Sequence, residues 1–163
     1  MMDKEEERKN IALLKEEMNN EKTISKDKIE FLSKEIDNRL AMLNLEDAID
    51  VANKLNYNLP IDYCVYYAKQ LNLHIKPNLF KIDTTEKVIN SLLSFDSNSK
   101  MFILNYQKID SQYNGKIVPF ALLEFGDYLC FDKNNNNIVY YNHETDTVEP
   151  ISKNWDDFYK ILY

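Results

Sequence analysis

Four short runs of apolar, β-branched and aromatic residues follow one another in the last third of the chain. They cover residues 117–122, 128–132, 138–142 and 147–151, and turn-forming residues separate them. Runs of this length and composition predict short strands joined by tight turns. The asparagines at 134–137 lie between two of the runs, and asparagine tolerates the left-handed backbone of such turns. We therefore expect an antiparallel β meander.

Segments with apolar residues at helical intervals precede and follow this meander. Trp155, Phe158, Ile161 and Leu162 recur at helical intervals and predict a closing helix on one face of the sheet. Upstream, Asn44 is suited to cap a helix over 44–55, with its inner face expected to hold Leu45, Ile49, Ala52 and Leu55. Helices first, antiparallel strands second and a final helix together predict an α+β domain.

The segment between the first helices and the meander is predicted element by element. Pro60 suits the start of a second helix over 60–72, with Tyr63, Tyr66, Tyr67 and Leu71 buried. Residues 79–82 predict a short strand. Asp83 to Glu86 resembles a capping box and predicts a helix that continues to Phe95. A further short helix is expected over 100–111.

The first 43 residues form a charged helical extension in this interpretation, and 44–163 form the α+β domain. Apolar residues fall at spacings of three and four among Lys and Glu: Ile11, Leu14, Met18, Ile29, Leu32, Ile36, Leu40 and Leu43. Thr23 to Ser25 is expected to interrupt the helix, with Ser25 capping its second half. The extension is expected to pack on the domain or to pair weakly with another copy, so the oligomeric state stays open.

The net charge of −7 is concentrated near the C-terminus. Residues 120–163 hold three basic and eight acidic side chains, which gives −5 of the total. A nucleic-acid partner needs clustered Lys and Arg, so we expect none. Surface acidity usually serves solubility alone. Acidity gathered on one part of a fold can also steer a basic protein partner into contact.

The sequence contains few groups suited to catalysis or cofactor binding. Only 2 glycines are present, neither in a phosphate-binding pattern. Cys64 and Cys130 lie among apolar residues without a neighbouring base, and His143 with Glu144 would point to opposite faces of a strand. We expect no catalysis, metal or cofactor. A charged N-terminus and the lack of an apolar run of about 20 residues favour a cytoplasmic protein without a membrane span.

Several motifs resemble those of the SUKH superfamily over about residues 44–163. They are Gly126-Asp127-Tyr128-Leu129-Cys130-Phe131-Asp132, the strand that ends in His143-Glu144, the closing Trp155-Asp156-Asp157-Phe158, and the Leu59-Pro60 break between two helices. Asn72 to His74 departs from the glycines that the family often carries there. The resemblance implies an α+β domain that binds proteins. Many bacterial members are immunity proteins paired with polymorphic toxins, often nucleases or deaminases, whereas fungal and viral relatives act in regulation.

We therefore predict a non-catalytic domain that neutralises a basic toxin domain by direct binding. Two alternatives stay open: a regulatory or scaffold protein that uses its N-terminal helix and, ranked last, an enzyme. The residues predicted to contact the partner are five carboxylates and one aromatic anchor: Glu124, Asp127, Asp132, Glu144, Asp146 and Tyr140.

Overall fold

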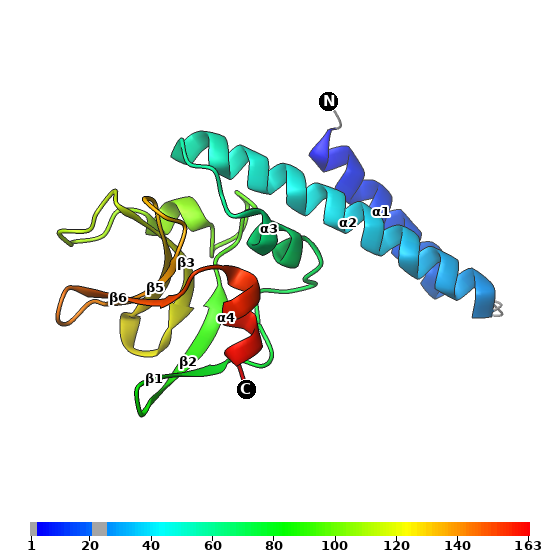
Figure 1. The fold of residues 1–163 in the computed structure, drawn as a ribbon. Helices are drawn as coiled ribbons and strands as arrows, with labels where there is room; N and C mark the ends of the chain where they lie inside the picture. The colour runs from blue at the N-terminus through cyan, green and yellow to red at the C-terminus, as the bar shows by residue number, and fades with distance from the viewer. Residues whose placement is uncertain (1–2, 21–25) are drawn as a thin grey trace.

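A helical hairpin extends away from a β-rich body in the computed structural model (Figure 1), which describes residues 3–20 and 26–163. The hairpin consists of α1 (Lys4–Asn20) and α2 (Lys26–Leu55). Ile11, Ile36 and Leu43 form its small apolar core. The predicted interruption at Thr23 and the cap at Ser25 lie outside the described residues.

The helix α2 passes through Asn44 without a break, so the prediction that Asn44 begins a helix is wrong. Its side chain instead donates to the carbonyl oxygen of Ala68, at 3.1 Å. The predicted inner face is also wrong in part, because Leu45 and Ile49 are 39% and 59% exposed. One side of α2 faces α1 and another faces the body, which leaves these two residues on a third, uncovered side. The division into 1–43 and 44–163 stays a prediction.

The helix α3 (Ile61–Ala68) confirms a helix after Pro60 but ends earlier than predicted. Leu71 therefore lies beyond it and is 79% exposed, not buried. The predicted helix from Asp83 is wrong, because Asp83 takes a φ of 53° in a turn between two strands. These are β1 (Leu79–Ile82) and β2 (Thr85–Leu92). The predicted helix over 100–111 shrinks to a 3-10 helix at Ile103–Tyr106.

The predicted meander is confirmed. It consists of β3 (Ile117–Leu123), β4 (Tyr128–Asp132), β5 (Ile138–Asn142) and β6 (Thr147–Ser152). With β1 and β2 these strands form one antiparallel sheet in sequence order. The helix α4 (Trp155–Ile161) follows, and the side chain of Asn154 caps it by accepting from the amide of Asp157 at 2.8 Å. The α+β prediction is therefore confirmed.

Both faces of the central strands β3 to β5 are covered. On the inner face the ring of Tyr63, from α3, lies 4.9 Å from that of Phe120, 5.2 Å from Phe131 and 5.0 Å from Trp155. On the outer face Cys130 and Tyr141 are buried together beneath the segment before β3, which contributes Ile109 and Tyr113. The edge strand β6 and the turns at the ends of the strands are the parts of the meander that remain accessible.

Candidate functional site

Two turns of the meander lie at the same end of the sheet and carry most of the predicted site. Successive strands run in opposite directions, so the β3–β4 turn and the β5–β6 turn meet at one end, and the β4–β5 turn lies at the other. Glu124, Asp127, Glu144 and Asp146 belong to the first end. Asp132 ends β4 at the opposite end, where it accepts from the amide of Asn134 at 2.9 Å. The structure thus brings four of the five predicted carboxylates together and separates Asp132 from them.

Asp127 ties the two turns to each other from within. Its residue is only 7% exposed. The carboxylate accepts hydrogen bonds from the hydroxyl of Tyr140, from the amide of His143 at 3.1 Å and from Nδ1 of His143 at 2.8 Å. Burial on its own would raise the pKa of Asp127, but the bonds from Tyr140 and His143 outweigh it and lower the pKa below its ordinary value. Asp127 is therefore an ionised structural clamp.

Tyr140, the predicted aromatic anchor, is 5% exposed and belongs to the inner core. Its ring lies opposite Leu129 in the sheet register, and the ammonium group of Lys87 lies 4.8 Å from the ring centre. Burial and the bond to Asp127 raise the pKa of the hydroxyl. This side chain supports the turns from below and does not present a surface to a partner in the described conformation.

Asp146 holds a covering segment against the outer face of the sheet. It accepts from the hydroxyl of Ser111, from the amide of Gln112 at 3.2 Å and from the hydroxyl of Tyr141 at 3.0 Å. The hydrogen bond from Ser111 contributes most to lowering the pKa of this carboxyl. The side chain is only partly exposed, and its oxygens are already engaged.

The exposed part of this end consists of residues 124–126 and 143–145, which we call the turn surface. Glu124 and Glu144 are both exposed there. Phe125 follows Glu124 in the β3–β4 turn, is 86% exposed and has a φ of 62°. The sequence analysis did not select Phe125. The available signal was a large aromatic residue directly before the glycine of a turn.

A shallow depression of about 430 Å³ lies beside the turn surface. Its wall includes the half-buried Tyr128 and the buried Tyr141. The other polar residues and the turn glycine that line it are Lys108, Asp110, Gly126 and His143. The rings of Tyr128 and Tyr141 stack with their centres 6.4 Å apart. This end therefore combines exposed carboxylates with aromatic surface, which is a composition suited to binding another protein.

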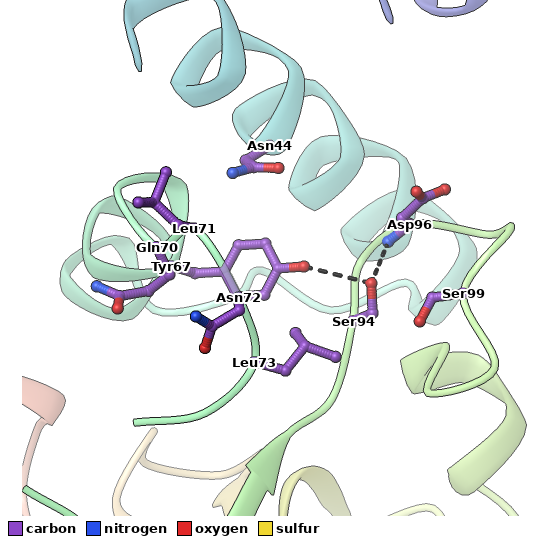
Figure 2. A pocket seen from close by; sticks show the side chains of 9 residues that line it. All are labelled: Asn44, Tyr67, Gln70, Leu71, Asn72, Leu73, Ser94, Asp96 and Ser99. Carbon is purple, nitrogen blue, oxygen red and sulfur yellow. Dashed lines mark hydrogen bonds between the residues drawn. The ribbon is translucent and has the colours of Figure 1, made fainter. Parts of the chain in front are cut away.

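A second hollow, of about 250 Å³, lies between α2, the end of α3 and residues 94–99 (Figure 2). The Tyr67 hydroxyl accepts from the amide of Phe95 at 2.9 Å and lies 3.4 Å from Oγ of Ser94. Oγ of Ser94 in turn accepts from the amide of Asp96, at 3.0 Å. Because these polar groups bond to one another, the hollow is a junction that joins α3 to the loop after β2.

A third hollow is an apolar groove of about 550 Å³ between α2 and α3. Leu45 and Ile49 border it from α2, and Ile61 and Val65 border it from α3, with exposures between 39% and 81%. Cys64 also lines the groove, and burial raises the pKa of its thiol to about 11. At neutral pH this thiol is protonated and poorly nucleophilic.

Among the side chains that the structure describes, those of residues 3–16 and 31–163, no three from His, Cys, Asp or Glu gather as metal ligands would. In the same part of the chain, no helix combines the length and apolar character needed to cross a membrane. Cys130 is fully buried, and burial raises the pKa of its thiol well above the ordinary value.

Comparison with known proteins settles the family. A sequence model of the SMI1/KNR4 family (SUKH-1) matches residues 42–161, from the middle of α2 to the end of α4. The chain belongs to the SMI1/KNR4 family (SUKH-1). No curated protein and no solved structure matches the chain. In this SUKH-1 domain the Gly126-Asp127 motif forms the clamped turn, and Trp155 and Phe158 fill the inner core.

Proposed function

We propose that this SUKH-1 protein is a cytoplasmic immunity protein that binds a basic toxin domain through the turn surface and neutralises it without catalysis. The family supports a protein-binding role of the immunity type. The observation that carries the proposal is the pair of exposed carboxylates, Glu124 and Glu144, on two turns that the buried Asp127 holds together.

Electrostatics explain why such a surface suits an inhibitor of a toxin. An immunity protein must associate with its target before the target acts, so the association rate matters as much as the affinity. A cluster of charge complementary to the partner raises the association rate well above the neutral range of about 10⁵–10⁶ M⁻¹s⁻¹ at low salt. The partner therefore carries Lys and Arg around the surface that it presents.

Charge reversal tests the proposal. The probe is the purified C-terminal domain of the toxin-like protein encoded beside the chain's own gene, and the double variant is Glu124→Lys/Glu144→Lys. We expect its association rate to fall at least about tenfold at low salt, with a smaller difference at high salt, because salt screens exposed charges. Growth rescue on co-expression with the toxin domain should fall in parallel.

The matched control reverses two exposed carboxylates on the helical hairpin, Glu16→Lys/Asp37→Lys, and so changes the net charge equally. We expect it to bind and to rescue growth like the wild type. Equal losses in both double variants would show that net charge matters and the turn surface does not. A wild-type protein that neither binds the neighbouring toxin domain nor rescues growth would remove the immunity proposal.

A second candidate function uses the N-terminal helices as a regulatory interaction module. The observation that favours it is the uncovered side of α2, where Phe31, Met42 and Ile49 are 65%, 56% and 59% exposed. In that case Ile49→Glu would abolish partner binding, and Glu124→Lys/Glu144→Lys would leave it intact. The immunity proposal expects the opposite pattern.

A further inference from the structure

We infer that Phe125 is the apolar anchor of the turn surface, and that the partner presents an apolar pocket bordered by basic side chains. This inference rests on the proposed function and names the chemistry of the contact. Three independent properties of Phe125 support it: its exposure, its backbone conformation and the rigidity of the turn that holds it.

The first property is the exposure of the Phe125 side chain. At 86% it is the most exposed large apolar side chain among those the structure describes, ahead of Ile61 at 81% and Leu71 at 79%. A phenylalanine ring in water forgoes the free energy that burial would supply. At this exposure the ring makes little contact with the rest of the described chain.

The backbone of Phe125 is the second property. Five non-glycine residues in the described part of the chain have positive φ, and four of them are Asn or Asp: Asn56, Asp83, Asn136 and Asp146. Asn and Asp tolerate this conformation because their short polar side chains bond locally. Phe125, with φ 62° and ψ 20°, is the exception. A bulky aromatic residue in this region is strained, and strain of this kind gathers at functional sites.

The turn beneath Phe125 is held from several sides. The amide of Leu123 donates to the carbonyl oxygen of Asp127 at 2.9 Å, and the Asp127 carboxylate binds His143 across the two turns. Gly126 has a φ of 84°, and a Cβ there would meet the His143 ring at 3.3 Å. The aromatic ring is therefore presented on a preorganised base, which reduces the entropy cost of binding.

The charges around Phe125 define the partner's pocket. Glu124 precedes it, and Glu144 lies on the adjoining turn. An apolar pocket with an acidic border would repel this surface, whereas a basic border would pair with both carboxylates. The arrangement matches that of interface hot spots, in which a central aromatic side chain enters a pocket and polar groups form the rim.

The substitution Phe125→Asn tests both the strain and the anchor. Without any partner, we expect the variant to melt a few degrees higher than the wild type, because Asn fits the left-handed conformation better. With the neighbouring toxin domain as the probe, we expect Kd to rise at least about 30-fold, the size of a hot-spot loss. Phe125→Tyr should retain binding within a few fold. The control Leu13→Asn, which changes a 61% exposed leucine on α1, should bind like the wild type.

The outcomes separate this inference from the proposed function. A wild-type protein that does not bind the toxin domain overturns both. Wild-type binding with an unchanged Kd for Phe125→Asn overturns the anchor alone and leaves the immunity proposal in place. A variant that melts at the same or a lower temperature contradicts the strain argument. Higher stability together with lost affinity supports the inference, because a purely structural role would not move the two in opposite directions.

Discussion

The β-rich body and the helical hairpin are held together by different forces. The body is organised around the fully buried Tyr63, whose ring contacts Phe120, Phe131 and Trp155. In the hairpin, a small apolar cluster of Ile11, Ile36 and Leu43 is supplemented by ion pairs, such as Arg39 with Glu7 at 3.1 Å. Burial of large rings stabilises by several kcal/mol, whereas a partly exposed ion pair adds at most about 1 kcal/mol. The hairpin should therefore open locally well before the body unfolds.

The largest effect is expected from Trp155→Ala in the body. Trp155 is 1% exposed and packs against Tyr63, Tyr66 and Phe158. Its removal leaves a cavity and should lower the free energy of unfolding by about 3–5 kcal/mol, as measured by guanidinium titration. A loss below about 1 kcal/mol would contradict the view that this aromatic cluster holds the body together.

Asp127→Asn should lower the free energy of unfolding by about 1.5–3 kcal/mol at pH 7, because hydrogen bonds to a buried carboxylate are lost. The pKa of Asp127 is lowered by folding, so its stabilisation is present above the ordinary Asp pKa of about 3.9 and is lost as pH falls through the folded value. The difference in the free energy of unfolding between wild type and variant should become smaller when unfolding is measured at pH 3. A gap that stays constant from pH 7 to pH 3 would count against an ionised clamp.

Tyr63→Phe should leave stability unchanged or raise it by about 1 kcal/mol. The Tyr63 hydroxyl is buried and has no hydrogen-bond partner among the described residues, and burial raises its pKa strongly. Removing an unpaired buried hydroxyl removes its desolvation cost while the ring contacts remain. Thermal unfolding followed by circular dichroism tests this, and a clear drop in melting temperature would reveal a bond that the structure does not show.

The smallest effect is expected from Arg8→Ala in the hairpin. Arg8 of α1 pairs with Asp47 of α2 and with Asp96 of the body, both at 3.3 Å, and its side chain is 34% exposed. The substitution should lower the free energy of unfolding by less than about 1 kcal/mol, and this difference should disappear near 1 M NaCl, where the Debye length is about 3 Å. Amide hydrogen exchange should show faster exchange in α1 and unchanged rates in β3 to β5. Faster exchange in both regions would mean that hairpin and body open as one unit.

The meander and α4 could be predicted from the sequence because their signals are local. Runs of alternating or continuous apolar residues between turn residues do not depend on distant contacts. The pattern at Asp83 to Glu86 failed for the converse reason. The same residues suit a helix cap or a tight turn, and the pairing of Ile89 with Leu123, far along the chain, decides in favour of a strand.

The candidate site was predictable only as a location. The acidic turns could be expected from charge and from the Gly126-Asp127 motif. Which of their residues are buried and which are exposed could not be expected, and this decides the role of each. Asp127 and Tyr140 bond to each other inside the fold, and Asp132 lies at the other end of the sheet. Phe125 is exposed in a turn where its φ is 62°, and no periodicity in the sequence encodes that angle.

The unbroken course of α2 has a consequence for how the protein reaches its surroundings. Its 30 residues form a rod of about 45 Å, one end of which projects from the body while the other packs beside the aromatic core (Figure 1). A helix without a joint transmits orientation as well as distance. Molecules bound near the two ends of α2 would therefore keep a set separation and a set relative orientation.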